Sequence, residues 1–488
     1  MSVPREALTG QVCWPMQSPT DQEKIVDIVD QERAITGKGI SFSEVISALS
    51  YALDITEGQP VGHAARSCLI GMRIAQELSL SRAEQSALFY GLLLKDLGCS
   101  SNASKVCSLF GSDDRTVKRD LKTTNWTKMI DSVGYLFRNA VLGSSVWRKI
   151  SRVAVLASEG QSTARELVQI RCDRGAKIAR DLLLPEMTAV AIHSLDEHWN
   201  GYGYPDGLTG DRIPRLARVM NLAQTIEVFW HRDGIDAACD MAVDRSGSWF
   251  DPEMVGAFLG LRNDPELHEN FQAADAATAA AAVEPPDLTL PAGDDQLERL
   301  ALGFSEVVDA KSPWTYEHSR GVARLSEGMG AILDISGRRL RKLRWAALLH
   351  DIGKLGVSNL ILDKPAKLNA EELVQMRKHT SYTHEILRRV QGFAEFAEMA
   401  AGHHERIDGR GYHRGISGDE ISLEMRILAV ADMYEALAAK RPYRQEKTTE
   451  EALTIIARET GSGLCPIVVA ALRTFLAQNR FVPYQVAA

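Results

Sequence analysis

The chain has 488 residues, of which 45% are hydrophobic and 25% are charged, so it has enough apolar material for the cores of two or three domains. Its formal net charge of −8 argues against a general binder of DNA or RNA polymers, which would carry a basic stripe, but it is compatible with a small anionic ligand. There is no run of about 18 apolar residues and no secretion signal, so we expect a cytoplasmic protein without a membrane span.

Nearly all of the chain reads as helix. Apolar residues recur at three- and four-residue intervals, for example in residues 322–335 and 451–460, and alternating strand-like segments are scarce. Residues 1–40 are too short for a domain and are expected to form a helical extension. Residues 41–272 are expected to form a first helical domain, with an insertion at about residues 100–170 whose mixed composition predicts short helices. The expected fold class is all-α.

A linker at residues 273–295 separates the two halves of the chain. Residues 273–283 are rich in alanine and could extend the last helix of the first domain, because alanine has the best helix propensity. Pro285 and Pro286 must stop such a helix. We therefore expect a semi-rigid Ala/Pro-rich tether between two tandem helical bundles, the second of which covers residues 296–488.

The second bundle carries residues that suit metal ions. His350 and Asp351 follow an apolar helix-like run, and His403 and His404 follow another. Imidazole and carboxylate together favour first-row divalent metals, and neighbours on a helix point about 100° apart, so each pair can reach two ions. The further candidate ligands are His379 and Asp432. The whole set predicts a two-metal hydrolase.

Three motifs in this bundle point to a known family. They are His350-Asp351-Ile352-Gly353-Lys354, His403-His404-Glu405 and Asp408-Gly409-Arg410-Gly411-Tyr412-His413, with Arg441-Pro442-Tyr443-Arg444 behind them. With these motifs, the chain from about residue 296 to residue 481 resembles the HD-GYP domain, a group of HD phosphohydrolases that hydrolyses cyclic dinucleotides. One departure is plain, since His413 stands where the family has proline.

The resemblance implies a metal site. The family's ligand positions fall on His350, Asp351, His379, His403, His404 and Asp432, with Asp351 as the bridging carboxylate. His318 matches a further family histidine, which is a ligand in three-metal members and lies near the site in two-metal members. Three-metal members also have a glutamate at the position of Trp314. Since indole cannot replace a carboxylate ligand, we expect two divalent ions, with iron or manganese favoured.

The resemblance also implies a mechanism. Two ions roughly 3.5–4 Å apart can lower the pKa of a bridging water and hold a phosphodiester for in-line attack. Lys354 matches a phosphate contact and would offset the charge that builds on the phosphoryl oxygens, so Asp351 and Lys354 are the expected catalytic residues. The other expected substrate contacts are Gly411, Tyr412, Arg441 and Arg444. Packing remains an alternative for Tyr412, as bracing of helices does for the two arginines.

The first bundle reads as a degenerate copy of the second. Residues 43–98 align without gaps on the start of the second bundle. The alignment places Asp54 on Asp309, His63 on His318, Lys95 on His350, Asp96 on Asp351 and Cys99 on Lys354. Further on, Arg171 takes the place of His379, Leu195-Asp196 that of the histidine pair, and Gln224 that of Asp432. Ammonium, amide and guanidinium groups do not bind these ions, so a two-metal site cannot assemble from His63, Asp96 and Asp196 alone. A single weakly bound ion is the alternative, and Gly203-Tyr204-Pro205 is kept.

Two functions from different classes follow. The first is a metal-dependent phosphodiesterase that opens a cyclic dinucleotide to the linear form, with cyclic di-GMP favoured and cyclic GMP-AMP as a close variant. The second is a receptor or scaffold that binds the nucleotide without turnover. The first copy would be a structural partner within an intramolecular pseudo-dimer, or it would sense a nucleotide or bind a protein partner; a homodimer is also compatible.

Overall fold

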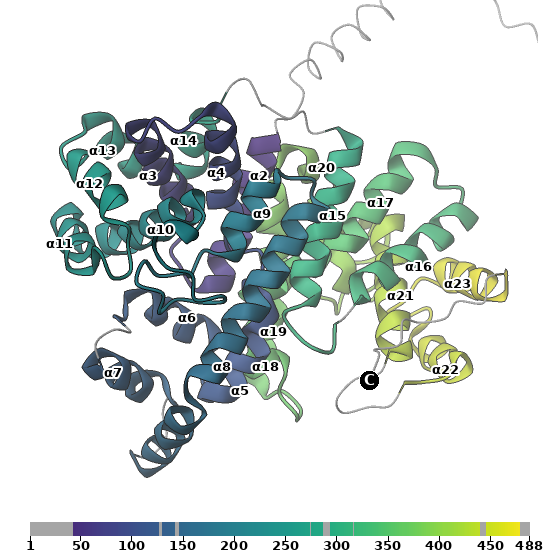
Figure 1. Ribbon diagram of the computed structural model, residues 1–488. Coiled ribbons are helices and arrows are strands. Elements are labelled where there is room, and N and C mark those ends of the chain that lie inside the picture. The colour runs from purple at the N-terminus through teal and green to yellow at the C-terminus, as the bar shows by residue number, and fades with distance from the viewer. Residues whose placement is uncertain are drawn as a thin grey trace, which may run out of the picture. The chain divides into compact units, whose positions relative to one another are not determined.

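The computed structural model describes residues 42–125, 129–141, 146–273, 275–285, 293–315, 317–439 and 446–478, which form helices joined by short connections (Figure 1). Within these ranges there is no β-strand, and only isolated bridges such as Ser246–Phe250 and Thr460–Leu464 occur. The all-α prediction is confirmed. The predicted extension at residues 1–40, as well as Arg441 and Arg444, lies outside the described residues.

In the first copy, α3 and α10 pack against each other, and α4 and α9 pack beside them. α4 begins at Ser81, whose side chain accepts a hydrogen bond from the Glu84 amide while the Glu84 carboxylate accepts one from the Ser81 amide. This exchange satisfies two donors that the helix end leaves free. The helices of this copy are α2 (Phe42–Glu57), α3 (His63–Glu77), α4 (Arg82–Leu94), η1 (Cys99–Asn102), α9 (Glu186–His193), η2 (Gly210–Arg212), α10 (Arg215–Asp233), α11 (Ile235–Arg245), α12 (Pro252–Gly260) and α13 (Pro265–Gln272).

The insertion of the first copy contains α5 (Ala103–Phe110), α6 (Asp114–Thr123), α7 (Met129–Asn139) and α8 (Val146–Asp181). The prediction of short helices holds for the first three but is wrong for α8, which runs for 36 residues. No proline interrupts its sequence, and its last part is held by packing, since Cys172 and Ala176 are buried. Val106, Val117 and Tyr135 give the insertion a small core of its own.

The alanine tract forms a separate helix, α14 (Ala276–Ala282), and does not extend α13. The carboxylate of Asp275 accepts hydrogen bonds from the first amides of α14 and so starts a new helix. α14 packs on α2 and α3, and the Glu284 carboxylate that follows it accepts hydrogen bonds from Ser43 and Tyr90, each at 2.6 Å. This part of the linker is therefore docked on the first copy.

The second copy repeats the arrangement of the first. α16 packs against α17 and α21, and α19 packs against η4 and α20. These helices enclose the segment that carries His350 and Asp351, between α17 and η4. The helices are α15 (Asp294–Asp309), α16 (His318–Ile332), α17 (Gly337–Leu349), η4 (Ile352–Gly356), α18 (Asn359–Leu362), α19 (Ala370–Arg388), α20 (Gln391–Ala401), η5 (Gly402–His404), η6 (Gly418–Glu420), α21 (Leu423–Ala438), α22 (Thr449–Glu459) and α23 (Pro466–Gln478).

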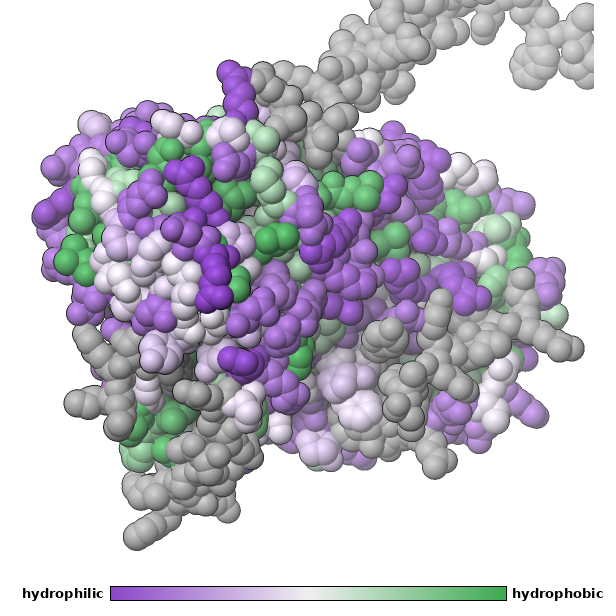
Figure 2. Space-filling view, in the orientation of Figure 1, coloured by the Kyte–Doolittle hydropathy of each residue, from purple (hydrophilic) through white to green (hydrophobic). Residues whose placement is uncertain are grey.

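The two copies contact each other within this one chain. The Tyr51 hydroxyl of α2 donates a hydrogen bond to the Glu385 carboxylate of α19 at 2.8 Å, and the Arg389 guanidinium lies 4.1 Å from the centre of the Tyr51 ring. Burial and the neighbouring Glu385 raise the pKa of Tyr51 to about 12, so the phenol stays a donor. Hydrophilic residues cover most of the face in Figure 2, including the side of α8. None of the described helices is long and apolar enough to cross a membrane.

Candidate metal centre

Three buried histidines of the second copy are oriented in the same way. The Nδ1 atoms of His350, His379 and His403 each donate a hydrogen bond to the carbonyl three residues earlier, at 2.8, 2.7 and 2.6 Å. A neutral imidazole that donates through Nδ1 has its lone pair on Nε2. The end of α17, the middle of α19 and the short helix η5 after α20 therefore present three Nε2 atoms toward the same interior space.

His318 is oriented by a carboxylate. Its Nδ1 donates to Glu435, which lies one turn after Asp432 on α21, and both side chains are buried. Pairing of a histidine with a carboxylate fixes the ring and is the usual support of a metal-binding imidazole. Sequence reasoning missed Glu435. A comparison of the two copies could have found it, because the first copy has the same pair in His63 and Glu227.

The polar atoms collect in two groups. In the first, the Nε2 atom of His318 lies 3.3 Å from an Asp432 oxygen and 3.6 Å from an Asp351 oxygen. The Nε2 atom of His350 lies 3.3 Å from an Asp351 oxygen and 3.8 Å from an Asp432 oxygen. These four residues come from three separate elements, and the atoms of His318, His350 and Asp432 lie close enough together to bind one cation.

The second group is rich in histidine. The Nε2 atoms of His379 and His403 lie 3.4 Å apart, and His404 completes the group. The other Asp351 oxygen lies 3.6 Å from His379 Nε2 and 3.8 Å from His403 Nε2. Asp351 thus faces both groups, one with each carboxylate oxygen.

The donor set fits metal ions. His318 Nε2, His350 Nε2 and Asp351 Oδ1 are buried and have no hydrogen-bond partner among the residues that the structure describes. Buried polar atoms without a partner are costly, and here they converge on a space lined by imidazole and carboxylate, which suits divalent transition metals. These residues could hold two ions that share Asp351.

The pKa shifts show where positive charge is required. Burial opposes a charge on His350, yet Asp351 and Asp432 raise its pKa to about 9. On the other side, burial lowers the pKa of His379 to about 3 and that of His404 to about 4. The carboxylate-rich group therefore attracts a cation, while the histidine group keeps neutral imidazoles whose lone pairs are free.

Lys354 belongs to this centre, because its ammonium group donates to Asp351 and its side chain is mostly buried. It lies on η4, which is pressed against α19: a Cβ atom on Gly353 would collide with the His379 carbonyl. Thr383 closes this contact, accepting from the Gly353 amide at 3.0 Å and donating to the His350 carbonyl at 2.9 Å. Glycine is required here by close approach of two backbones.

The loop after the histidine pair bends back over the centre. The Glu405 carboxylate accepts hydrogen bonds from the Arg414 and Gly415 amides at 2.7 and 3.1 Å. Gly411 has no room for a side chain beside the His404 carbonyl. Tyr412 lies against the histidines, with its ring 4.7 Å from that of His404 and 6.2 Å from that of His379. Gly411 and Tyr412 are thus at the centre.

The backbone conformation of His413 does not allow the proline that the family has at this position. Its φ is +114°, which the proline ring cannot adopt. The His413 ring lies 5.4 Å from that of His384, and His384 pairs with Glu398 at 3.2 Å. Neither histidine belongs to the two ligand groups.

The first copy has the predicted register. A Cβ atom on Gly98 would collide with the Arg171 carbonyl, as one on Gly353 would with that of His379. Gly203 likewise approaches the Asp196 carbonyl as Gly411 approaches that of His404. These matching contacts confirm the positions given to Arg171 and Asp196.

Cations of the chain itself fill the corresponding centre of the first copy. Lys95 donates to Asp96, and Arg171 pairs with Asp196. The sequence did not predict that Lys122 of α6 would also enter, where its ammonium lies 3.5 Å from Asp96 and 3.4 Å from Glu57. Each carboxylate of this centre therefore already faces an ammonium or guanidinium group.

The buried His63 should make the free energy of unfolding depend on pH. Burial and the nearby Lys95 lower its pKa to about 4, so the folded chain keeps His63 neutral while the unfolded chain binds a proton near pH 6.5. Between pH 7.5 and pH 5 this residue should remove about 2 kcal/mol from the free energy of unfolding. Urea unfolding of wild type and His63→Gln at both pH values checks this. An equal pH dependence in the two proteins would contradict it.

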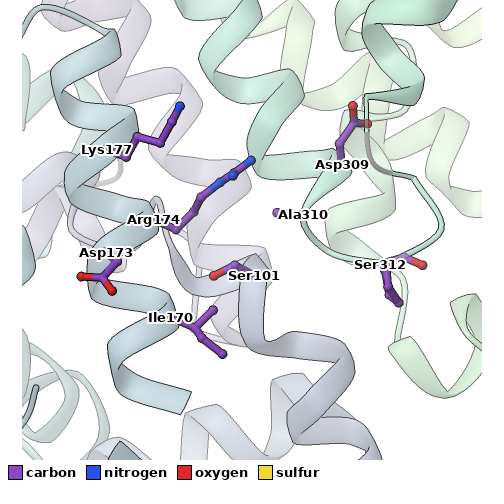
Figure 3. A pocket seen from close by; sticks show the side chains of 9 residues that line it. Ser101, Ile170, Asp173, Arg174, Lys177, Asp309, Ala310 and Ser312 are labelled. Atoms are coloured by element: carbon purple, nitrogen blue, oxygen red, sulfur yellow. The ribbon is translucent and has the colours of Figure 1, made fainter. Parts of the chain in front are cut away.

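A pocket of about 480 Å³ lies outside the metal centre, between α8 and the segment after α15. Figure 3 shows Arg174 and Lys177 reaching from α8 toward Asp309 and Ala310. Both cations already approach Glu306, at 3.5 and 3.3 Å. Since Glu306 already neutralises much of the charge of Arg174 and Lys177, this pocket is a poor site for an anion.

Comparison with known proteins gives consistent results. The family model described as HD domain matches residues 141–254 and 304–464. The 3′3′-cGAMP-specific phosphodiesterase 3 of Vibrio cholerae serotype O1 is 43% identical over 434 residues, which cover 89% of this chain and 94% of that protein. The crystal structure of a cyclic GMP-AMP specific phosphodiesterase from V. cholerae matches with a TM-score of 0.61 and 38% identity over 90% of this chain and 98% of that one. The cyclic di-GMP phosphodiesterase of Thermotoga maritima is 39% identical over 159 residues, or 32% of this chain and 43% of that protein. This chain therefore belongs to the HD-domain family, as a tandem HD-GYP phosphodiesterase whose first copy has lost most of the metal-type residues of the second.

Proposed function

We propose that this chain hydrolyses 3′3′-cyclic GMP-AMP to the linear dinucleotide, with cyclic di-GMP as the second candidate substrate. One relative named for 3′3′-cGAMP matches most of the chain, including both copies. Two others named for 3′3′-cGAMP match 35% of it, and the T. maritima relative named for cyclic di-GMP matches 32%. This difference in coverage reverses the order of substrates that the motifs alone favour.

The observation that carries the proposal is the division of seven side chains into two groups around Asp351. We assign His318, His350 and Asp432 to one divalent ion and His379, His403 and His404 to the other, with Asp351 shared. Iron and manganese suit such a mixed set of imidazole and carboxylate ligands. When bound, the two ions would supply an activated water and polarise the phosphodiester.

The chain's own groups would bind and orient the substrate. Lys354 stands beside Asp351, where its ammonium would offset negative charge on the phosphoryl oxygens. Tyr412 lies against the histidine group, where its ring would stack on a base or hold the sugar–phosphate edge. Arg441 and Arg444 stay proposed contacts of the second phosphate.

The test is turnover by the purified chain with 3′3′-cGAMP, cyclic di-GMP and an equimolar mixture, after reconstitution with manganese or, anaerobically, with iron. We expect about two ions per chain by elemental analysis and a higher kcat/KM for 3′3′-cGAMP. Higher kcat/KM for cyclic di-GMP would reverse the substrate order. If the chain with two bound ions binds the nucleotide tightly but does not hydrolyse it, the proposed enzyme activity is wrong and the receptor function takes its place.

A further inference from the structure

Helix α6 of the insertion contacts the catalytic copy through a buried ion pair. Asp114, in its first turn, faces the Lys311 ammonium at 3.3 Å, and neither side chain is exposed. The second oxygen of Asp114 accepts from the Asn359 amide at 3.1 Å, and the Asn359 side chain donates to the Lys311 carbonyl at 2.8 Å. Within the described residues, α6 is thus anchored in the second copy by an ion pair whose two side chains are fully buried.

Arg115 extends this contact to the segment that carries Lys354. Its guanidinium donates to the carbonyl of Gly356, the last residue of η4, at 2.6 Å. Gly356 is also enclosed by Ile55 of the first copy and Tyr382 of α19. The first copy therefore holds one end of η4, two residues beyond Lys354.

The other end of α6 enters the centre of the first copy. Lys118 donates to the Cys99 carbonyl and approaches Glu57 at 3.7 Å, while Lys122 reaches Glu57 and Asp96. A helix of ten residues is about 15 Å long and stiff. One short rigid element is thus fixed at both ends, in the cation-filled centre and beside η4.

We propose that Arg115 is a positioning residue for the hydrolysis: it holds η4 at Gly356 and thereby keeps the Lys354 ammonium on Asp351. The expected effect on kcat rests on the proposed function, whereas the expected effect on the order of η4 rests on the contacts alone. An error of about 1 Å in the place of a catalytic group is enough to cost 10²-fold in rate. Arg119, on the same helix, offers a matched control, because it is half exposed and its one ion pair with a described residue is with the adjacent Asp120.

The structural consequence is measured by hydrogen exchange in the full chain. Two backbone hydrogen bonds hold η4: the Lys354 amide donates to the Asp351 carbonyl at 2.8 Å, and the Val357 amide donates to the Lys354 carbonyl at 3.0 Å. We expect Arg115→Ala to speed exchange in peptides that cover residues 352–358 by about tenfold, with the rest of the second copy unchanged. Arg119→Ala should leave these peptides unchanged. Equal exchange in Arg115→Ala and wild type would overturn the inference, whether or not the protein turns over substrate.

The catalytic consequence is measured by kinetics at matched metal content. We expect Arg115→Ala to lower kcat by about tenfold with two ions still bound, because Asp351, the ligand nearest to η4, precedes it at the end opposite Gly356. Arg115→Lys, which can still donate to the Gly356 carbonyl, should recover part of kcat. An unchanged kcat, or a loss that follows the melting temperature alone, would contradict positioning. A wild-type chain that hydrolyses no cyclic dinucleotide would refute the proposed function and leave the decision to hydrogen exchange.

Discussion

Asp351→Asn should lower kcat by about 10³-fold or more and reduce the number of bound ions. The substitution keeps the shape of the side chain but removes the charge that both ligand groups share, since each Asp351 oxygen faces one group. It also leaves Lys354 and His350 without their nearest carboxylate. Steady-state kinetics with 3′3′-cGAMP and elemental analysis of the same preparation measure the two effects.

The chain contains the matched control for this experiment. Asp96 stands at the equivalent position of the first copy, where it is surrounded by ammonium groups. Asp96→Asn should keep both ions and most of the turnover, provided that the assay temperature leaves the variant folded. If Asp351→Asn retained more than a tenth of wild-type kcat, or if Asp96→Asn lost the ions, the assignment of the centre to the second copy would be wrong.

Asp114→Ala should lower the free energy of unfolding by about 3–5 kcal/mol, because it leaves the fully buried Lys311 without its partner. Burial already lowers the pKa of Lys311 with Asp114 present, so in the variant the lysine must lose its proton or draw in water. Urea unfolding followed by circular dichroism, with a constant m value, measures the loss.

Two further variants separate the ion pair from the helix. Asp120→Ala, on the exposed side of α6, removes a surface pair with Arg119 and should cost less than about 1 kcal/mol. Adding Lys311→Met to Asp114→Ala removes the unpaired charge and should restore most of the stability. Equal stability of Asp114→Ala and Asp120→Ala would show that the buried pair does not hold the copies together.

The sequence by itself determined the helical class, the tandem copies and most of the centre. Helices follow from apolar spacing over three or four residues, and the candidate ligands follow from the chemistry of the histidine and aspartate side chains within or beside such runs. The comparison of the two copies also predicted which positions had lost a ligand, because Lys95 and Arg171 differ in charge from the histidines they replace. All of this information lies in short segments, where the backbone period decides which residues share a face.

The tertiary structure alone decided which distant groups meet. His318 and Glu435 are 117 positions apart, and Arg115 and Gly356 are 241 apart, so no local period relates them. The length of α8, the docking of α14 and the entry of Lys122 into the first centre likewise depend on packing against other elements. Such contacts form because buried charges must find partners, and the nearest partner is set by how the helices pack, not by their order in the chain.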